Sequence, residues 1–146
     1  MTSTTTPHTV YLSLGTNIGN RVQNLLCAIK MIQSRIGTIE SLSDFIITEP
    51  WGFDSQNTFM NAAVGISTTL GPMPLLRATQ QIETDMGRTQ KSTDGTYHDR
   101  IIDIDILLFD DLHIDTPQLT VPHPLMKQRE FVIRPLAQIL PTISEL

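Results

Sequence analysis

The sequence predicts an α+β domain in which a mostly antiparallel sheet has helices packed on one face. Three observations support this fold class. Segments with strand-like alternation and segments with a helical apolar period follow in the order strand, helix, strand, strand, helix, strand, which is the split βαβ pattern. Glycines and prolines fall between these segments, where the chain has to turn. The 146 residues, of which 40% are hydrophobic and 17% charged, suffice for a globular domain with its own core.

The first half of the chain is expected to contain a strand, a helix and a second strand. Residues 8–14 alternate as in a strand and lead into the glycine- and asparagine-rich segment 15–20, which is typical of a tight turn. Residues 20–35 have apolar side chains every three or four positions, which predicts an amphipathic helix capped by an asparagine of that turn. Residues 39–48 then have the composition of a strand.

The second half is expected to add a strand, a helix and a further strand. Residues 58–70 alternate as a strand, and the Gly-Pro pair after them leads into a predicted helix over residues 73–86. The apolar residues 102–108 predict another strand. A short strand at 112–114 and an apolar segment at 131–140, which is compatible with a helix or a strand, complete the domain.

Composition excludes several classes of protein. No apolar run reaches the length of a membrane span, and the N-terminal residues lack the apolar core of a signal peptide. We therefore expect a cytoplasmic protein that binds no membrane. Residues 1–146 are expected to form one domain, with residues 1–7 as a frayed terminus. The single cysteine, Cys27, falls on the first predicted helix, and we interpret it as a small core residue rather than a nucleophile.

The charge distribution argues against a general nucleic-acid binder. The formal net charge is −5, whereas such proteins usually have a basic surplus. No lysine or arginine occurs between Arg35 and Arg77, and the cations gather in the later part of the chain. These later cations are Arg88, Lys91, Arg100, Lys127, Arg129 and Arg134. They are compatible either with binding of a small polyanion or with scattered solubilising charges.

Residues 98–109, HDRIIDIDILLF, contain the clearest functional signal, which is a pair of carboxylates within an apolar strand. Alternate side chains of a strand share a face, so Asp103 and Asp105 are expected on one face and the apolar side chains on the other. The apolar side chains are those of Ile102, Ile104, Ile106 and Leu108. Two carboxylates at this spacing can hold Mg²⁺ against phosphates. Like charges on neighbouring positions of one face are also unfavourable unless a cation lies between them. The alternative is an edge strand whose outer face is only solvated.

Four other features have both a structural and a functional interpretation. Residues 88–99 have no periodicity and form either a basic lid over phosphates or a plain connector. Trp51 lies in a loop rich in proline and glycine, where it either fills a hinge or covers a flat ligand. Asn61 either bonds a neighbouring backbone group or binds the polar edge of a ligand. His123, held between two prolines, is either structural or part of a binding site.

Six segments make the chain similar to one known family. They are LSLGTNIGNR, TEPWG, FMNAAV, IETDMGR, DRIIDIDILLF and LTVPHPLMKQREFV, and they extend over nearly the whole chain. The sequence resembles the 6-hydroxymethyl-7,8-dihydropterin pyrophosphokinase family of folate biosynthesis. The resemblance implies a ferredoxin-like α+β domain that transfers pyrophosphate from ATP to the pterin hydroxymethyl group and releases AMP. It also implies ATP as co-substrate and two Mg²⁺ ions as cofactors.

The resemblance further implies roles for individual residues. Asp103 and Asp105 would hold both metal ions, and Arg88 and Arg100 would act with them as catalytic residues on the triphosphate. The implied ATP site comprises Gln80, Glu83, Arg88, Lys91, Arg100, Ile106, Leu119, Thr120, His123 and Arg129, with Glu83 directed toward the ribose. The implied pterin slot comprises Thr48, Pro50, Trp51, Phe59, Asn61, Asp103 and Phe131. Aromatic faces and an amide suit a pterin, because it is planar and has a polar edge.

Three positions depart from the family pattern. Gln90 stands in place of a loop arginine, Gln118 in place of a basic residue, and Pro124 in place of the aromatic residue after the histidine. Each change removes an implied contact with phosphate or adenine, so we expect an effect on ATP affinity rather than on the type of reaction. The loop is also longer than in the best-known members, and Tyr97 is the candidate for its aromatic position.

Two other functions use some of the same features. A magnesium-dependent nucleotidyltransferase also combines a glycine turn with a strand D-x-D, although Gly15 and Asp103 are far apart in this sequence. A non-catalytic ferredoxin-like module would bind a ligand without needing paired aspartates. For the main interpretation, we expect a monomeric enzyme whose partners are small-molecule substrates, namely ATP and a reduced pterin, and no nucleic acid.

Overall fold

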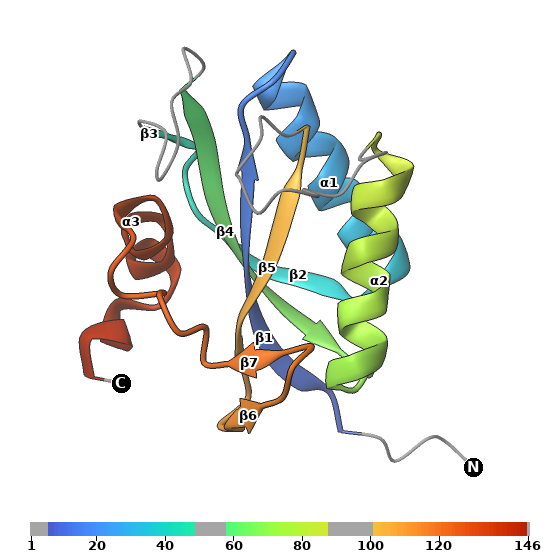
Figure 1. Ribbon diagram of the computed structural model, residues 1–146, viewed down its shortest axis with the longest axis vertical. Helices are drawn as coiled ribbons and strands as arrows, with labels where there is room; N and C mark the ends of the chain where they lie inside the picture. Colours follow the sequence, from blue (N-terminus) through green and yellow to red (C-terminus); the bar gives the residue numbers. More distant parts are fainter. Residues whose placement is uncertain (1–5, 49–57, 88–100, 146) are drawn as a thin grey trace.

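The computed structural model describes residues 6–48, 58–87 and 101–145. Its centre is a five-stranded sheet in which all paired strands are antiparallel. The strand order is β2-β4-β1-β5, and β3 also pairs with β4 (Figure 1). The strands are β1 (His8–Thr16), β2 (Thr38–Leu42), β3 (Ile46–Thr48), β4 (Phe59–Thr68) and β5 (Asp103–Phe109). The predicted α+β class with a mostly antiparallel sheet is confirmed.

Helices cover both faces of this sheet. α1 (Arg21–Arg35) and α2 (Pro72–Asp85) lie on one face, and α3 (Glu130–Ile139) lies on the other, followed by the 3-10 helix η1 (Pro141–Glu145) (Figure 1). The expectation that the helices share one face is therefore wrong for α3. Both faces of the sheet have buried apolar side chains, and each face needs its own cover. None of the helices in the described segments has the length and apolar composition needed to cross a membrane.

Two hydrophobic clusters fill the space between the sheet and the helices. The larger cluster packs the sheet against α1 and α2, and Leu12, Leu14, Leu25, Ile66 and Ile82 are among its fully buried members. The smaller cluster packs α3 against the opposite face. Its buried members are Ala63, Leu107, Leu108, Met126, Val132, Leu136 and Ile143. The sheet therefore forms the middle of three layers.

A bulge in β5 changes the face that the end of this strand presents. The neighbouring residues Tyr11 and Leu12 of β1 pair with Leu108 and Ile106 of β5, so Leu107 is an extra residue. Because the bulge shifts the alternation by one position, Leu108 packs under α3 and not with Ile106. The prediction that Leu108 shares a face with the isoleucines of β5 is wrong, since strict alternation holds only where pairing is regular.

Other predicted elements are present with shifted ends. The predicted strand over 39–48 is two strands, β2 and β3, which pair with successive parts of β4. β1 continues through Gly15, so the turn predicted to begin at this residue begins later. Asn20 caps α1, because its Oδ1 accepts a hydrogen bond from the backbone N–H of Gln23 at 3.1 Å. The ambiguous segment 131–140 is helical through residue 139, as part of α3, and Leu140 is the C-cap.

After β5 the chain forms a small hairpin that returns to the edge of the sheet. β6 (Ile114–Asp115) and β7 (Thr120–Val121) pair as a separate two-stranded sheet, slightly later than the strand predicted at 112–114. The backbone N–H of His123 then donates a hydrogen bond to the carbonyl oxygen of Leu107 at 2.9 Å. This bond anchors the segment after β7 on the bulge of β5.

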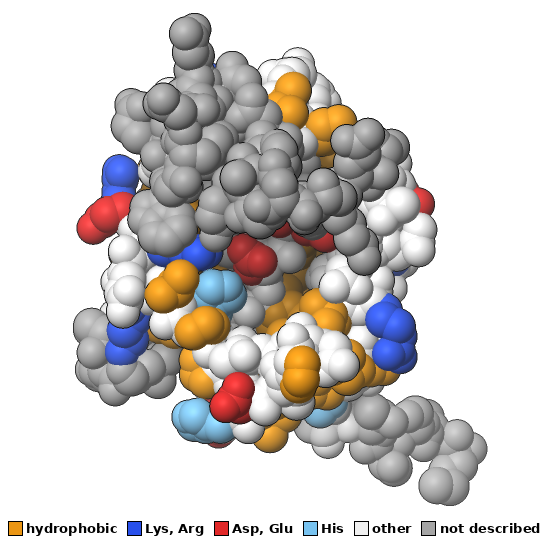
Figure 2. Space-filling model, viewed as in Figure 1, with side chains coloured by type: hydrophobic (Ala, Val, Ile, Leu, Met, Phe, Trp, Pro, Cys, Tyr) orange, Lys and Arg blue, Asp and Glu red, His pale blue; other side chains and the backbone are white. Residues whose placement is uncertain are grey.

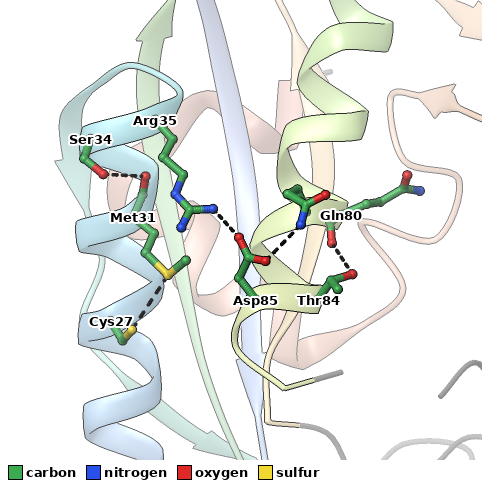
Figure 3. A network of polar contacts seen from close by, with 8 residues as sticks. Cys27, Met31, Ser34, Arg35, Gln80, Thr84 and Asp85 are labelled. Atoms are coloured by element: carbon green, nitrogen blue, oxygen red, sulfur yellow. Dashed lines mark hydrogen bonds and ion pairs between the residues drawn. The ribbon is translucent and has the colours of Figure 1, made fainter. Parts of the chain in front are cut away.

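Polar contacts join α1 and α2 near their C-terminal ends. The guanidinium of Arg35 forms an ion pair with Asp85, with Nη1 at 2.6 Å from Oδ2, and Gln81 donates to the same carboxylate at 2.9 Å (Figure 3). The hydrogen bond from Arg35, and then that from Gln81, hold the pKa of Asp85 below its ordinary value. Such exposed contacts add little to the stability of two helices that share the larger apolar cluster.

Cys27 lies on the exposed side of α1, so the prediction of a core cysteine is wrong. Its Sγ is 3.8 Å from Sδ of Met31, one turn further along the helix (Figure 3). The buried stripe of α1 consists of Leu25, Ala28 and Ile32. At about 100° per residue, Cys27 points well away from this stripe, and a helix that buries only a stripe leaves such a residue exposed.

Candidate active site

Three strands bring polar side chains together on the sheet face opposite α1 and α2. Gly15 of β1 pairs with Asn61 of β4 on one side and with Asp103 of β5 on the other. Directly opposite residues of antiparallel strands share a face, so these residues form one row, the Asn61–Gly15–Asp103 row. At ordinary strand spacing, the backbones of Asn61 and Asp103 are about 10 Å apart. In the same way, Asp105 lies opposite Ser13.

Asp103 and Asp105 are both half-buried on this face, in agreement with the alternation of the strand. Within the segments that the structure describes, no group of three or more His, Cys, Asp or Glu side chains could hold a metal ion. Mg²⁺ does not require such a group, because it usually binds through one or two carboxylates and takes its other ligands from water and substrate phosphates. The pair of aspartates therefore fits an Mg²⁺ ion that arrives with a nucleotide.

His123 and Arg129 lie close to Asp103. Burial lowers the pKa of His123 below 6.5, the positive charge of Arg129 lowers it further, and the carboxylate of Asp103 raises it. The ring Nδ1 accepts a hydrogen bond from the backbone N–H of Leu125 at 3.3 Å, which assigns the proton of the neutral ring to Nε2. The space-filling view shows the side of the molecule where the edge strand β5 lies, and acidic, basic and histidine side chains lie close together near its middle (Figure 2).

Polar and aromatic side chains meet where β3 joins β4. Thr48 pairs with Phe59, and the Thr48 hydroxyl donates a hydrogen bond to Oδ1 of Asn61 at 2.8 Å. Because Asn61 is only 2% exposed, this bond fixes the orientation of its amide. Phe131, at the start of α3, contributes a second ring, and the guanidinium carbon of Arg129 lies 5.6 Å from the centroid of that ring. These side chains include an amide and two aromatic rings, the groups that suit a planar heterocycle.

Other predicted ATP-binding residues lie on the α2 side of β5. Glu83 of α2 is 5% exposed, and its Oε2 accepts a hydrogen bond from the backbone N–H of Ile104 at 2.8 Å. Ile106 and Leu119 belong to the cluster between the sheet and the helices α1 and α2, and Gln80 is exposed on α2. β5 is an edge strand of the described sheet. These residues therefore lie on one side of this edge strand, and the aspartates lie on the other.

The hydrogen bond from Ile104 to Glu83 predicts a measurable contribution to stability. We expect Glu83→Ala to lower the free energy of unfolding by about 1–3 kcal/mol, because a buried backbone N–H loses its acceptor. Glu83→Gln keeps an acceptor oxygen in this position and should lose clearly less. Urea denaturation followed by circular dichroism measures both changes. Equal losses in the two variants would indicate that the charge of Glu83, rather than this hydrogen bond, stabilises the fold.

The lowered pKa of His123 predicts that stability depends on pH. When the pKa of a histidine is lower in the folded than in the unfolded state, the folded state loses relative stability as the pH falls below the unfolded value, here about 6.5. Without Mg²⁺ and nucleotide, the wild type should therefore lose more stability than His123→Asn upon acidification below this pH. Above about pH 7.5 the two proteins should respond alike, because the ring is neutral in both states. Denaturation curves at a series of pH values measure the difference, and parallel loss in both proteins would contradict it.

Several predicted site residues lie outside the described residues, and their roles stay predictions. They are Pro50, Trp51, Arg88, Lys91 and Arg100, and the same applies to Gln90, Tyr97 and the whole loop 88–99. Of the remaining positions, Thr120 begins β7, and both Gln118 and Pro124 are exposed in the segments around it.

Two positions of the site region were not predicted from the sequence. The predicted turn placed Gly15 outside β1, although the alternation of this strand continues to Thr16, which is fully buried. Arg21, the first residue of α1, donates through Nη1 to the carbonyl oxygen and the hydroxyl of Thr58, at 2.9 and 2.5 Å. Continued alternation is a usable signal for Gly15. No local pattern indicates the contact between Arg21 and Thr58, because the two residues are 37 positions apart in the sequence.

A cavity of about 870 Å³ lies at the other ends of β1 and β5. Its lining includes His8, Tyr11, Leu108, Asp110 and Leu140. None of the predicted site residues lines this cavity. The candidate active site is therefore the polar region around the Asn61–Gly15–Asp103 row and not this cavity.

The fold and the site together define the class of this protein as an α+β domain with a polar site built around two carboxylates of β5. Comparison with known proteins then specifies the family. Residues 11–141 match the family described as 7,8-dihydro-6-hydroxymethylpterin-pyrophosphokinase (HPPK). The chain belongs to this family.

Individual relatives agree with this assignment. The chain is 50% identical over 133 residues to the 2-amino-4-hydroxy-6-hydroxymethyldihydropteridine pyrophosphokinase of Porphyromonas gingivalis, with 90% of each chain covered. It is 42% identical over 136 residues to the protein of the same name from Bacillus subtilis, with 92% of this chain and 80% of the relative covered.

Solved structures of HPPK-DHPS proteins share the fold. A crystal structure of HPPK-DHPS in complex with substrates has a TM-score of 0.75 at 15% identity and covers 94% of this chain. A structure of Plasmodium falciparum HPPK-DHPS with pteroate has a TM-score of 0.71 at 16% identity and covers 87% of this chain. The chain spans 40% of the length of each of these two structures. At such low identity the likeness concerns the fold.

Proposed function

We propose how this member of the family catalyses its reaction, the transfer of the pyrophosphoryl group of ATP to the hydroxymethyl group of 6-hydroxymethyl-7,8-dihydropterin with release of AMP. This reaction is a step of tetrahydrofolate biosynthesis. ATP is the co-substrate and Mg²⁺ accompanies it; binding of two Mg²⁺ ions by Asp103 and Asp105 is part of the proposal. The supporting observation is the Asn61–Gly15–Asp103 row, because it sets a carboxylate suited to metal binding next to an amide suited to a heterocycle.

The nucleotide is proposed to cross the edge of β5. Its base and ribose would lie toward α2, near Gln80 and Glu83, and its triphosphate would lie toward Asp103. The distribution of the predicted ATP-binding residues on the two sides of this strand supports the arrangement. On the phosphate side, Arg129 would supply positive charge, and His123 would donate a hydrogen bond from Nε2.

The pterin is proposed to bind between Phe59 and Phe131, with part of its polar edge at Asn61. A planar heterocycle binds well between aromatic rings, because each ring covers apolar area without losing much conformational freedom. The hydrogen bond from Thr48 to Asn61 supports a fixed amide, and the contact of Arg129 with Phe131 supports a fixed ring. Pro50 and Trp51, as the resemblance implies, would complete the slot.

Positioning and electrostatics would account for most of the catalysis. Asp103 and Asp105 would hold Mg²⁺, which when bound would supply positive charge to offset that of the phosphates and ease attack on the β-phosphorus. The pterin slot would hold the substrate hydroxyl in line with this phosphorus and the leaving AMP. Arg88 and Arg100 would stabilise the negative charge that develops on the transferred group. No covalent intermediate is required.

Incubation with Mg²⁺, ATP and 6-hydroxymethyl-7,8-dihydropterin tests the proposal. The expected products are AMP and the pterin diphosphate, separated by ion-exchange chromatography. Release of inorganic pyrophosphate together with a nucleotidylated product would indicate a nucleotidyltransferase instead. Binding of the pterin without any turnover would indicate a non-catalytic module. Omission of Mg²⁺ should abolish product formation, which serves as the control for the metal.

The same proposal includes the organisation of the protein in the cell. Residues 1–146 would act as one pyrophosphokinase domain, as a monomer, in the cytoplasm, with no membrane or nucleic acid as partner. The continuity of one sheet through the described segments supports a single domain. Light scattering after size-exclusion chromatography measures the oligomeric state, and a mass of about twice 16.3 kDa would contradict the monomer.

A further inference from the structure

Gly15 occupies an unusual place for a glycine, because it lies inside a central strand and is buried. Glycine weakens a strand, since it loses more conformational freedom on folding than other residues and has no side chain to pack. A glycine at such a place usually indicates that another group approaches the backbone closely. The groups directly opposite Gly15 are Asn61 and Asp103, both proposed to bind the substrate or its metal.

The space above Gly15 is taken by the Asn61 amide. A Cβ atom on Gly15 would lie 2.8 Å from Nδ2 of Asn61 and 3.8 Å from Cδ1 of Phe59. The first distance is too short for a stable contact, whereas the second is an ordinary one. Both neighbours are side-chain atoms, so an alanine here would displace the end of the Asn61 side chain rather than the sheet. At Gly37, by contrast, a Cβ would lie 2.2 Å from the backbone oxygen of Ser67.

Thr48 determines which end of the amide faces Gly15. Its hydroxyl donates to Oδ1 of Asn61 at 2.8 Å, and this bond directs the Nδ2 end toward Gly15. An amide nitrogen only donates hydrogen bonds, so this end of Asn61 suits a ring nitrogen or a carbonyl oxygen of the ligand. The orientation depends on two conditions, namely a hydroxyl at position 48 and the absence of a side chain at position 15.

We infer that Gly15 is a positioning residue for substrate recognition, because its missing side chain lets the Asn61 amide present its N–H donors to an acceptor atom on the pterin edge. This inference rests on the proposed function and deepens it. It assigns to Asn61 the donor role in recognition, and it assigns the orientation of that donor to Gly15 and Thr48. The ATP side of the site does not depend on this arrangement.

A double-mutant cycle tests the inference. The dissociation constant of the pterin is measured by fluorescence in the presence of Mg²⁺ and the non-hydrolysable analogue α,β-methylene-ATP. We expect Gly15→Ala to weaken pterin binding about 10- to 100-fold, as loss of an oriented hydrogen bond does. Affinity for the ATP analogue should change less than about twofold. In the background of Asn61→Ala, Gly15→Ala should have little further effect, because the displaced amide is already absent.

Gly71→Ala is the matched control, since a Cβ at this position would meet only Pro74 Cδ, at 3.9 Å. It should leave both affinities unchanged. The inference is overturned if Gly15→Ala weakens pterin binding equally with and without the Asn61 amide. It is also overturned if Gly15→Ala weakens binding of the pterin and of the ATP analogue equally. If the wild type neither binds nor converts the pterin, the proposed function fails. Normal wild-type activity with normal pterin binding by Gly15→Ala refutes only the role of Gly15.

Thr48→Val provides a test that does not require Gly15→Ala to fold. It removes the hydroxyl that holds Oδ1 of Asn61 while keeping the size of the side chain. The inference predicts weaker pterin binding in this variant, and again little further effect in the background of Asn61→Ala. Unchanged pterin affinity in Thr48→Val would show that the amide orientation is not what the substrate requires.

Discussion

Asp103→Asn and Asp105→Asn are each expected to lower kcat by about a thousandfold or more while the protein stays folded. Asparagine keeps the volume of the side chain but removes the negative charge that would bind Mg²⁺. Both residues are half-buried on the polar face of β5, and the buried isoleucines Ile104 and Ile106, which alternate with them, point to the other face. The change therefore removes metal ligands without disturbing the core.

Single-turnover measurements with saturating Mg²⁺, ATP and pterin test this expectation, and thermal melting checks the fold. Asp111→Asn is the matched control, because Asp111 is an exposed carboxylate in the turn after β5. It should retain wild-type activity. If either Asp103→Asn or Asp105→Asn turns over at a near-normal rate, the assignment of that residue as a metal ligand is wrong. Partial recovery at high Mg²⁺ concentration would support it.

Phe109→Ala is expected to produce a large loss of stability, about 3–5 kcal/mol in the free energy of unfolding. Phe109 is fully buried in the larger cluster, and its ring centroid lies 4.7 Å from that of His8. Truncation removes buried apolar area and leaves a cavity that the surrounding strands cannot easily fill. For a domain of this size the melting temperature should fall by about 10 °C or more.

Urea denaturation of Phe109→Ala and Leu112→Ala gives the comparison. Leu112 follows shortly after Phe109 in the chain but is 44% exposed, so its truncation should cost less than about 1 kcal/mol. At a temperature where Phe109→Ala is folded, its kcat should stay near the wild-type value, because Phe109 lies at the opposite end of β5 from Asp103. If Phe109→Ala loses as little stability as is expected of Leu112→Ala, the end of β5 contributes little to the core.

The elements that depend on local pattern were predicted well. The amphipathic helix α1, the alternation of β4 and the common face of Asp103 and Asp105 each follow from the period of side chains along a regular backbone. Predictions failed where the local period is interrupted or was not applied. The extra residue Leu107 shifts the end of β5, and Cys27 was assigned to the core from its residue type although it lies off the buried stripe of its helix.

The structure brings some of the predicted site residues together and places others on different sides of the sheet. The resemblance supplied candidates for both substrates, and the structure brings Thr48, Phe59 and Asn61 together at the junction of β3 and β4. It places Ile106 on the other side of β5 from the aspartates, which a list of residues does not indicate. Gly15 was missed as a site residue because its importance comes from its neighbours in the sheet and not from its own chemistry.

By itself, the sequence determined the fold class, the family and the pair of carboxylates on one strand face, because these depend on short segments with a regular period or a recognisable motif. Only the tertiary structure decided that α3 covers the second face of the sheet and that Asn61 and Asp103 lie on either side of Gly15. The physical reason is that strand register and layer order arise from contacts between segments distant in the chain. The periodicity of one segment specifies its own faces but not the partner that each face meets.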